Sequence, residues 1–179
     1  MSSAAKYLPR YTVDDYRQWE GDWELWQGIP VAMSPSPFGK HQMVLVNLVS
    51  ELRQALRSID CDATALCEID WVIADDTVVR PDAVVVCGGP PSGHVKSTPA
   101  IVAEIVSPAT ADRDRIHKKT LYHESAVGIY LILDPDTETV EAFQSTATGF
   151  QSLDASHELT FSLCDDCELR VDPKAFFNR

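Results

Sequence analysis

Two acidic residues stand beside or inside strongly apolar segments of the chain. Asp82 follows a proline and precedes the run "AVVVC", and Glu104 lies inside "IVAEIV". A carboxylate buried among apolar side chains is costly unless a partner compensates its charge. Both segments have the composition of buried strands, and a loop rather than a helix joins them. We therefore expect the two strands to be antiparallel neighbours that bring both carboxylates to one point.

Two carboxylates at one point are typical ligands of a hard divalent cation. Mg²⁺ and Mn²⁺ prefer oxygen ligands, and one or two carboxylates usually hold them while water and substrate phosphate complete the octahedron. The spacing therefore predicts a Mg²⁺ or Mn²⁺ site at Asp82 and Glu104. Taken alone, Asp82 is equally consistent with a residue that caps a loop. Glu104 needs a partner on either interpretation, because its neighbours in sequence are apolar.

Three further side chains are candidates for the same site. Lys118 lies in the helical segment after the second strand, with Asp114 and Tyr122 four residues before and after it, so these three share one face. Glu24 lies in "WELWQG", where the tryptophans would shield it, and His41 begins a helix. Each has a simpler alternative: a solvated helix lysine, an ordinary strand glutamate and a surface histidine at a helix N-terminus.

The periodicity of apolar residues predicts the elements that carry these side chains. A short helix begins after Thr12, and a β-hairpin turns near Gln27 and Gly28. Apolar residues at intervals of three and four predict a helix over residues 41–59. Continuous apolar runs predict further strands, of which the one around Glu104 is central. The expected order is strands over residues 63–73 and 78–89, a strand over 100–107, a helix over 112–125, a strand over 128–135, and short antiparallel strands with a last helical turn near Ala175.

Length and charge limit the class of protein. The 179 residues, 45% hydrophobic, favour one domain. No apolar signal region opens the chain and no apolar run is long enough to span a bilayer, so we expect a soluble, cytoplasmic protein without membrane contact. The net charge of -12 argues against a nucleic-acid coat protein but not against a nuclease, whose own site is acidic. The most basic cluster is "RDRIHKKT", which contains Arg113 and Lys119.

The five cysteines predict reduced thiols rather than a disulfide framework, because their number is odd and their spacing irregular. Cys164 and Cys167 form a CxxC pair. A structural zinc site needs two more ligands at matching spacing, and the sequence nearby has none. Two thiols in or beside a strand are the favoured interpretation.

Together these segments resemble a known family. "PD", "AEIVSPAT", "DRIHKKTLY" and "ILDP", preceded by "YTVDDYRQWEGDWELWQGIPVAMSPSPFGKHQ", are similar in order to the Uma2 family (DUF820), which is related to the PD-(D/E)xK restriction-endonuclease-like superfamily. The resemblance covers residues 11–143, about three quarters of the chain. It implies an α/β (α+β) fold over residues 1–179, in which helices flank a restriction-endonuclease-like mixed β-sheet core over about 11–143, followed by a β-rich tail over 144–179.

The resemblance also implies roles for individual residues. Asp82 and Glu104 match metal ligands, and the carbonyl of Ile105 would be a third ligand. The superfamily lysine would stand at position 106, which is valine here, and Lys118 matches the lysine that the next helix supplies instead. Glu24 matches a first-strand glutamate that would hold the metal through water or bind a second ion. His41, with Arg113 and Lys119, is the expected substrate-binding set.

The expected function is a Mg²⁺- or Mn²⁺-dependent endonuclease acting on DNA, and the β-rich tail over residues 139–171 offers a surface for a homodimer. The chain departs from the family at "AVGIYLIL", where Ile129 and Leu131 stand in place of a glutamate and a tryptophan. Together with the net charge of -12, this departure favours a rival interpretation, a catalytically inactive nuclease-like module for interaction or regulation. Hydrolysis of a smaller phosphate compound is a third.

Overall fold

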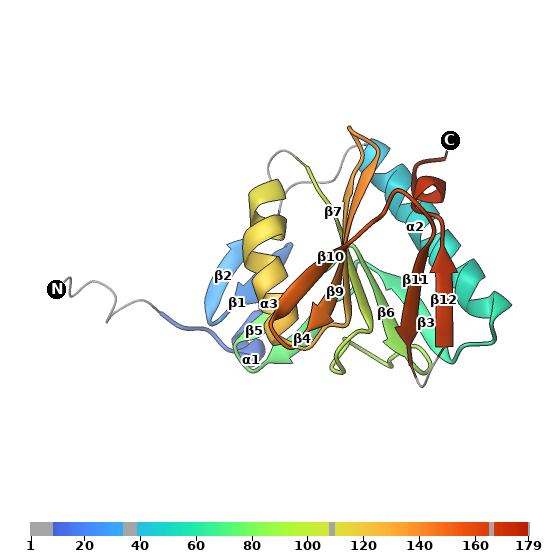
Figure 1. Ribbon diagram of the computed structural model, residues 1–179. Coiled ribbons are helices and arrows are strands. Elements are labelled where there is room, and N and C mark those ends of the chain that lie inside the picture. Colours follow the sequence, from blue (N-terminus) through green and yellow to red (C-terminus); the bar gives the residue numbers. More distant parts are fainter. Residues whose placement is uncertain (1–8, 34–38, 108–109, 165–166, 179) are drawn as a thin grey trace.

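The computed structural model describes residues 9–33, 39–107, 110–164 and 167–178. Helices separate runs of consecutive strands along this part of the chain, and the elements gather into layers (Figure 1). Their bounds, in chain order, are α1 (Val13–Tyr16), β1 (Trp23–Trp26), β2 (Ile29–Ala32), α2 (Gly39–Ser58), β3 (Ala63–Cys67), β4 (Trp71–Ala74), β5 (Thr77–Val79), β6 (Ala83–Cys87), β7 (Ile101–Ile105), the π-helix η2 (Arg113–Lys118), α3 (Lys119–Glu124), β8 (Ile129–Asp134), β9 (Thr139–Thr146), β10 (Gly149–Leu153), β11 (Leu159–Leu163), β12 (Cys167–Val171) and the 3-10 helix η3 (Pro173–Phe177).

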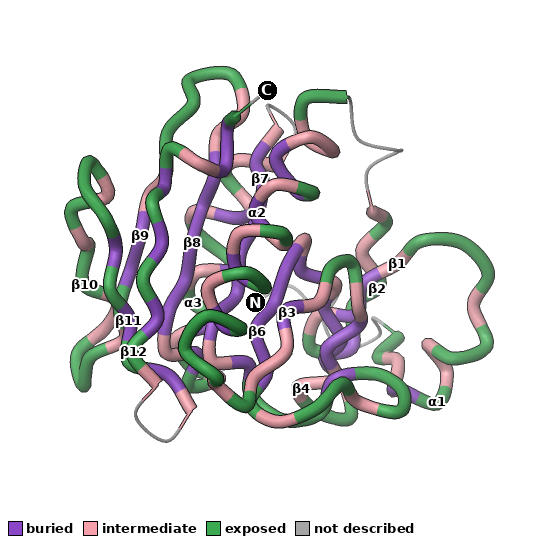
Figure 2. Tube along the Cα trace, turned by 90° about the vertical axis from the view of Figure 1, so that its right-hand side faces the viewer, coloured by how far each residue is buried: buried purple, intermediate pink, exposed green. Residues whose placement is uncertain are grey.

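A mixed six-stranded sheet forms the centre, in the order β10-β9-β8-β7-β6-β3. β7 and β8 are parallel, and the other neighbouring pairs are antiparallel. The strands β6, β7 and β8 are buried along nearly their whole length (Figure 2), as their continuous apolar runs predict. The predicted central position of the Glu104 strand is confirmed.

Alternate residues of the central strands face two different layers, because successive side chains of a strand point to opposite faces. On one face, Ala103 and Ile105 join a core that includes five buried residues of α2, the β11–β12 hairpin and η3. On the other, Val102 and Val106 join a core that includes Tyr122 of α3. Figure 1 shows these layers, with α2 on one side of the sheet and α3 on the other. The predicted helix over residues 41–59 is confirmed.

A second, four-stranded sheet in the order β2-β1-β5-β4 lies beside α1. Thr12 caps α1 through a capping box with Asp15, as its sequence predicts. Val13 then packs on Leu25 of β1 and Val78 of β5. The hairpin of β1 and β2 turns at Gln27 and Gly28, which both have positive φ.

Two predicted strands are each divided between the two sheets. The strand expected over residues 63–73 is broken into β3 and β4, and the one expected over 78–89 into β5 and β6, so those two predictions are wrong. Glu68 has a φ of 47° and donates its N–H to the carbonyl of Asp82 at 3.0 Å, which fixes both crossings at one place. The chain therefore leaves the large sheet just before the candidate site and returns to it at Asp82.

The cysteines form two disulfides, so the prediction of reduced thiols is wrong for four of them. Cys61 pairs with Cys167 and Cys87 pairs with Cys164, while Cys67 is free and exposed. The Cα–Cα distances of 5.8 and 5.4 Å are ordinary for disulfides. Both bridges join the β11–β12 hairpin to the segments beneath it, because Cys61 follows α2 and Cys87 ends β6. The CxxC spacing did not indicate these partners, because they lie 106 and 77 residues away.

In the described ranges, no helix combines the length and apolar character needed to cross a membrane.

Candidate active site

Asp82 and Glu104 meet at one end of the β6–β7 pair. Ala83 pairs with Ala103 in antiparallel register, so continuing that register by one residue sets Asp82 opposite Glu104. The backbone N–H of Ile105 donates to Asp82 Oδ2 at 2.6 Å. The prediction that the two strands are antiparallel neighbours is therefore confirmed, and the two acidic side chains lie next to each other.

Glu104 is only 4% exposed and has two partners. Lys118 Nζ donates to its Oε1 at 2.9 Å, and the Tyr122 hydroxyl donates to the same oxygen at 2.5 Å. Burial raises the pKa of Glu104 to about 8, against the lowering effect of the Lys118 charge, and the negative charges of Asp114 and Asp82 raise it further. The expectation that this buried carboxylate requires a partner is met. Both of these hydrogen bonds end at Oε1 of Glu104 and neither ends at its Oε2.

Lys118 is 3% exposed and lies among three acidic side chains. Besides Glu104, its Nζ lies 3.1 Å from Glu24 Oε1 and 3.9 Å from Asp114 Oδ1. Burial lowers the pKa of Lys118, but the charges of these carboxylates outweigh burial and raise it above its ordinary range. Lys118 therefore keeps its positive charge, and the alternative of a solvated helix lysine is wrong.

Glu24 reaches the site from the second sheet. Its Oε1 accepts the backbone N–H of Arg80 at 2.9 Å, and its Oε2 accepts the indole N–H of Trp26 at 3.1 Å. Glu24 is buried, so the shielding by tryptophan that its sequence suggests is present at Trp26. Both of its oxygens thus accept hydrogen bonds from protein groups, and Oε1 also faces the ammonium group of Lys118.

A π-helix carries Asp114 and Lys118. The predicted helix over residues 112–125 consists of η2 followed by α3. The carbonyl of Asp114 accepts the N–H of Lys119, five residues later, and also the hydroxyl of Tyr130 at 3.0 Å. A hydroxyl group that enters the backbone ladder is a recognised cause of irregular helix geometry, and π-turns are frequent at functional sites. Tyr130 of β8 therefore helps to hold the face that carries Lys118 toward Glu104.

Asp114 has an unusual environment for a carboxylate. It is 2% exposed, and within the described ranges its Oδ1 has no hydrogen-bond partner. Burial raises its pKa, although the charge of Lys118 opposes that shift. Sequence reasoning placed Asp114 and Tyr122 on the face of Lys118 but gave neither a role, although their spacing was the signal that marks them.

His41 lies against Asp82 at the start of α2. Its Nε2 is 3.3 Å from Asp82 Oδ1, and its side chain is 14% exposed. Burial lowers the pKa of His41, but the hydrogen bond and charge of Asp82 raise it by more, with contributions from Glu68 and the backbone of Ile105. The alternative of an ordinary surface histidine does not describe this position.

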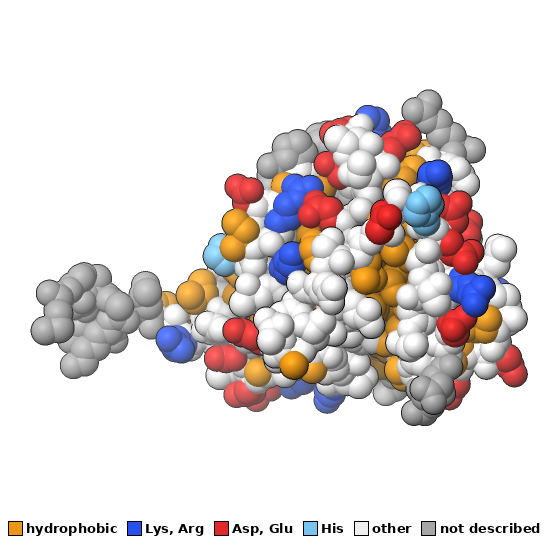
Figure 3. All heavy atoms as spheres, in the orientation of Figure 1, with side chains coloured by type: hydrophobic (Ala, Val, Ile, Leu, Met, Phe, Trp, Pro, Cys, Tyr) orange, Lys and Arg blue, Asp and Glu red, His pale blue; other side chains and the backbone are white. Residues whose placement is uncertain are grey.

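Arg113 and Lys119 lie against aromatic rings rather than against the carboxylates. The guanidinium of Arg113 is 5.9 Å from the centre of the Trp26 ring, and Lys119 Nζ is 3.4 Å from the centre of the Phe143 ring. Burial lowers the pKa of Lys119. In the view of Figure 3, Lys and Arg side chains adjoin Asp and Glu side chains in the region of α3. Their expected contact with substrate stays a prediction.

Sequence reasoning missed a second group of charged and polar side chains, which surrounds the buried Asp70. Arg80 donates through Nε to Asp70 Oδ1 at 2.7 Å, and Tyr16 donates its hydroxyl to Asp70 Oδ2 at 2.9 Å. Burial, and then Asp70, raise the pKa of Tyr16 to about 12. Arg80 stands two residues before Asp82, and its backbone N–H donates to Glu24. These contacts therefore fix the segment that leads into β6 and carries Asp82. Its only signal in the sequence is the arginine of "VVRPD".

The sequence of this chain matches a known family, and its fold is similar to that of a solved structure. The model of the Uma2 family, described as "Putative restriction endonuclease", matches residues 13–170. No curated protein matches the chain. One similar solved structure is that of "a putative nuclease belonging to DUF820" from Anabaena variabilis. It is 17% identical, has a TM-score of 0.70, and the match covers 94% of this chain and 99% of that chain. At this identity the likeness shows the fold, and the predicted fold class is confirmed.

Proposed function

The chain belongs to the Uma2 family, and from this premise we propose that it is a metal-dependent endonuclease that hydrolyses phosphodiester bonds of DNA. The observation that carries the proposal is the meeting of Asp82, Glu104 and Lys118 at one end of the β6–β7 pair. Two acidic groups and a charged amine from three different elements match the parts that metal-assisted phosphodiester hydrolysis needs. The family description and the nuclease-like fold support the same reaction class.

The donor atoms at this point fit Mg²⁺ or Mn²⁺. The side chain of Asp82 is 20% exposed, so solvent reaches it, and the two donors to Glu104 both bind Oε1. Glu104 Oε2, the Asp82 carboxylate and the carbonyl of Ile105 are hard oxygen ligands. No group of three or more His, Cys, Asp or Glu side chains spaced for a metal occurs among the residues described. That finding is compatible with Mg²⁺, which one or two carboxylates hold while water and phosphate supply the other ligands.

The proposed mechanism assigns each side chain one task. A bound ion would lower the pKa of a water ligand and offset the charge of the phosphodiester. Asp82 and Glu104 would hold the ion, and His41 orients Asp82 through its contact with Oδ1. Lys118, kept charged by its neighbours, stabilises the negative charge that develops on the phosphate oxygens. Glu24 positions Lys118, because its own oxygens already accept protein donors.

Cleavage of supercoiled plasmid and of single-stranded DNA with Mn²⁺ tests this proposal. We expect Asp82→Ala to reduce the rate at least 100-fold, within the usual range for loss of one electrostatic contribution to a transition state. Asp136→Ala is the matched control, because it removes an exposed carboxylate that pairs only with Lys40 in the described ranges. We expect the control to cleave at the rate of the unmodified protein. Equal rates for all three proteins would remove the assignment of Asp82.

One observation favours the inactive module as a second candidate. Lys118 and Glu24 are almost inaccessible, and the ammonium of Lys118 already faces three carboxylates, so this part of the site is closed without any metal. Thermal melting discriminates between the two candidates. An ion that binds only the folded state raises the melting temperature, by an amount that corresponds to about 2.7 kcal/mol at a hundredfold excess over Kd. A melting temperature that Mn²⁺ leaves unchanged would favour the module. The homodimer and the cytoplasmic location stay predictions.

A further inference from the structure

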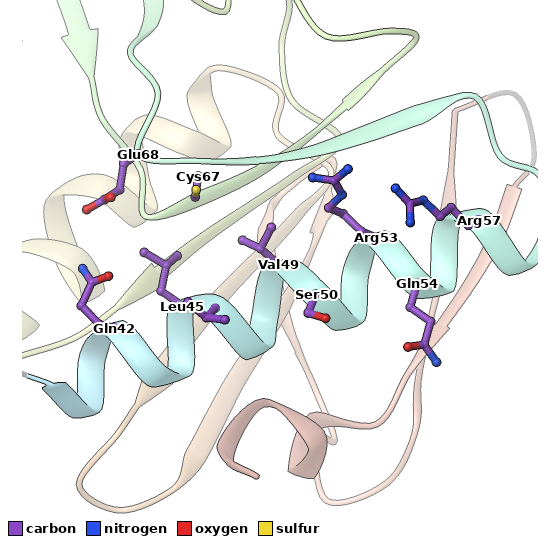
Figure 4. Close-up of a pocket in the computed structure, with 10 residues that line it drawn as sticks. Gln42, Leu45, Val49, Ser50, Arg53, Gln54, Arg57, Cys67 and Glu68 are labelled. Carbon is purple, nitrogen blue, oxygen red and sulfur yellow. The ribbon is translucent and has the colours of Figure 1, made fainter. Parts of the chain in front are cut away.

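A groove runs between α2 and the edge strand β3, and we refer to it as the α2–β3 groove (Figure 4). Its volume is about 640 Å³. β3 is the last strand of the six-stranded sheet, so the groove follows an open sheet edge. Its lining residues include Gln42, Arg53 and Arg57 of α2, and Cys67 and Glu68 at the end of β3.

One end of the α2–β3 groove adjoins the candidate active site. Glu68 lines the groove and donates its N–H to the carbonyl of Asp82 at 3.0 Å. Gln42, on the facing helix, follows His41, whose ring lies 3.3 Å from Asp82 Oδ1. A ligand that lies in the groove can therefore reach the site where Asp82 and Glu104 meet.

The other end of the groove is basic. Arg53 and Arg57 leave α2 on the side that faces β3 (Figure 4). Within the described part of the chain neither arginine has an ion pair or hydrogen bond, although the protein has 27 acidic residues and a net charge of -12. Both also line a second cavity of about 400 Å³ beside the first. Two guanidinium groups without acidic partners, on the wall of a cavity, are suited to an anionic ligand.

We propose that the α2–β3 groove binds the sugar-phosphate backbone of the nucleic-acid strand whose scissile bond lies at Asp82 and Glu104, with Arg53 and Arg57 as its phosphate-binding residues. This inference rests on the proposed function. At 1.5 Å per helical residue, Arg53 lies about 18 Å along α2 from His41, which corresponds to roughly five nucleotides of a duplex strand. Guanidinium groups bind phosphate through paired, charge-assisted hydrogen bonds.

The charge along the groove favours nucleic acid over a peptide. An extended peptide would add to the open edge of β3 through backbone hydrogen bonds, and such pairing does not require arginines. A phosphodiester strand accounts for both ends of the groove at once, because its scissile phosphate needs the acidic metal site and its neighbouring phosphates need cations.

Binding of fluorescein-labelled DNA, measured by anisotropy in buffer with EDTA so that no metal-dependent cleavage occurs, is the first test. We expect the double variant R53Q/R57Q to bind at least tenfold more weakly and to lower the slope of log K against log salt concentration by about two, one for each lost phosphate contact. The control K96Q/K174Q removes the same charge from two exposed lysines that do not line the groove. Equal weakening of both variants, or of neither, would overturn the inference.

Cys67 provides a second readout that does not depend on cleavage. It is the free cysteine of the described residues, is exposed, and lines the groove, whereas the other four cysteines are in disulfides. We expect DNA to slow maleimide labelling of Cys67 severalfold in the unmodified protein and not in R53Q/R57Q. Unchanged labelling with DNA, or protection by an uncharged strand-forming peptide instead, would refute the nucleic-acid assignment. If DNA binding and Cys67 labelling do not depend on Arg53 and Arg57 but Mn²⁺-dependent cleavage still requires Asp82, this inference alone is rejected. If DNA protects Cys67 but the protein does not cleave DNA with Mn²⁺, the proposed function alone is rejected.

Discussion

Replacing Lys118 by methionine would remove the cation from a buried group of acidic side chains. Methionine keeps an unbranched side chain of four heavy atoms but lacks the terminal ammonium group, which Oε1 of Glu104 and Oε1 of Glu24 face at 2.9 and 3.1 Å. Removal of one partner of a buried ion pair costs about 3–5 kcal/mol. Because domains of this kind unfold at a cost of about 5–15 kcal/mol, the variant should fold with reduced stability.

The pKa of Glu104 gives this loss a specific pH dependence. With a folded-state pKa of about 8 and an ordinary value of 4.5, Glu104 holds a proton in the folded protein that the unfolded chain releases between those values. Its contribution to stability is therefore fully present below about pH 4.5 and is lost as the pH rises through about 8. In Lys118→Met the charge that lowers this pKa is absent, so Glu104 must stay protonated to higher pH. Above pH 8 the cost of the substitution should grow by about 1.4 kcal/mol per pH unit.

Urea denaturation followed by circular dichroism at pH 7 and pH 9, with EDTA, measures both effects. Lys40→Met is the control, because Lys40 lies 2.8 Å from Asp136 but both side chains are more than 60% exposed, at 63% and 66%. We expect the control to lose less than about 1 kcal/mol at either pH. Adding Glu104→Gln to Lys118→Met should abolish the growth above pH 8. A loss for Lys118→Met no larger than that of the control, or one that does not change with pH, would refute the description of Lys118 as a buried cation held by Glu104.

Two further changes test the parts that support the site. Removal of the Cys87–Cys164 bridge alone should lower the free energy of unfolding by roughly 3–4 kcal/mol, because this bridge is nested within the 106-residue loop of Cys61–Cys167 and closes an additional loop of only about 30 residues. Reduction of both disulfides should lower the free energy of unfolding by more than that. Urea denaturation of the variant in which serine replaces Cys87 and Cys164 measures the loss caused by removing that bridge. A loss below about 1 kcal/mol would contradict the expected contribution of the bridge. Tyr122→Phe should cost about 1–3 kcal/mol, because Glu104 loses the hydroxyl donor at 2.5 Å, and an unchanged unfolding midpoint would argue against that hydrogen bond.

Much of the central sheet could be predicted because its strands are locally unambiguous. β6, β7 and β8 are continuous apolar runs, and the periodicity of α2 is regular, so the neighbours Asp82 and Glu104 followed from their strands. The breaks between β3 and β4 and between β5 and β6 could not be predicted in the same way. Residues 63–73 alternate partly between apolar and polar side chains, as one strand would, but the pairing of Trp71 with Val79 and Val95 places their second half outside the large sheet.

Features that depend on distant segments were beyond sequence reasoning for a similar reason. Cys164 and Cys167 reach their partners only after the β11–β12 hairpin covers the layer of α2, so the number and spacing of cysteines did not indicate the pairs. The π-turn at Asp114 has the same origin, because the hydroxyl that accompanies it comes from Tyr130 on β8. In contrast, the i, i+4 spacing of Asp114, Lys118 and Tyr122 was visible directly.

The two oxygens of Glu104 connect the buried charges to the proposed reaction. Oε1 accepts the hydrogen bonds of Lys118 and Tyr122, so an ion at Oε2 would displace only the proton that Glu104 holds below about pH 8, and Lys118 can remain in place. Apolar side chains often replace a buried ion pair without loss of stability, so stability alone does not explain why Glu24, Glu104, Asp114 and Lys118 are together here. The arrangement is explained if Glu24 and Asp114 keep Lys118 charged and in position, beside an oxygen that is reserved for metal. Under the proposed function, the positive charge that this acidic protein needs at the reaction centre would come from one buried amine and one bound ion.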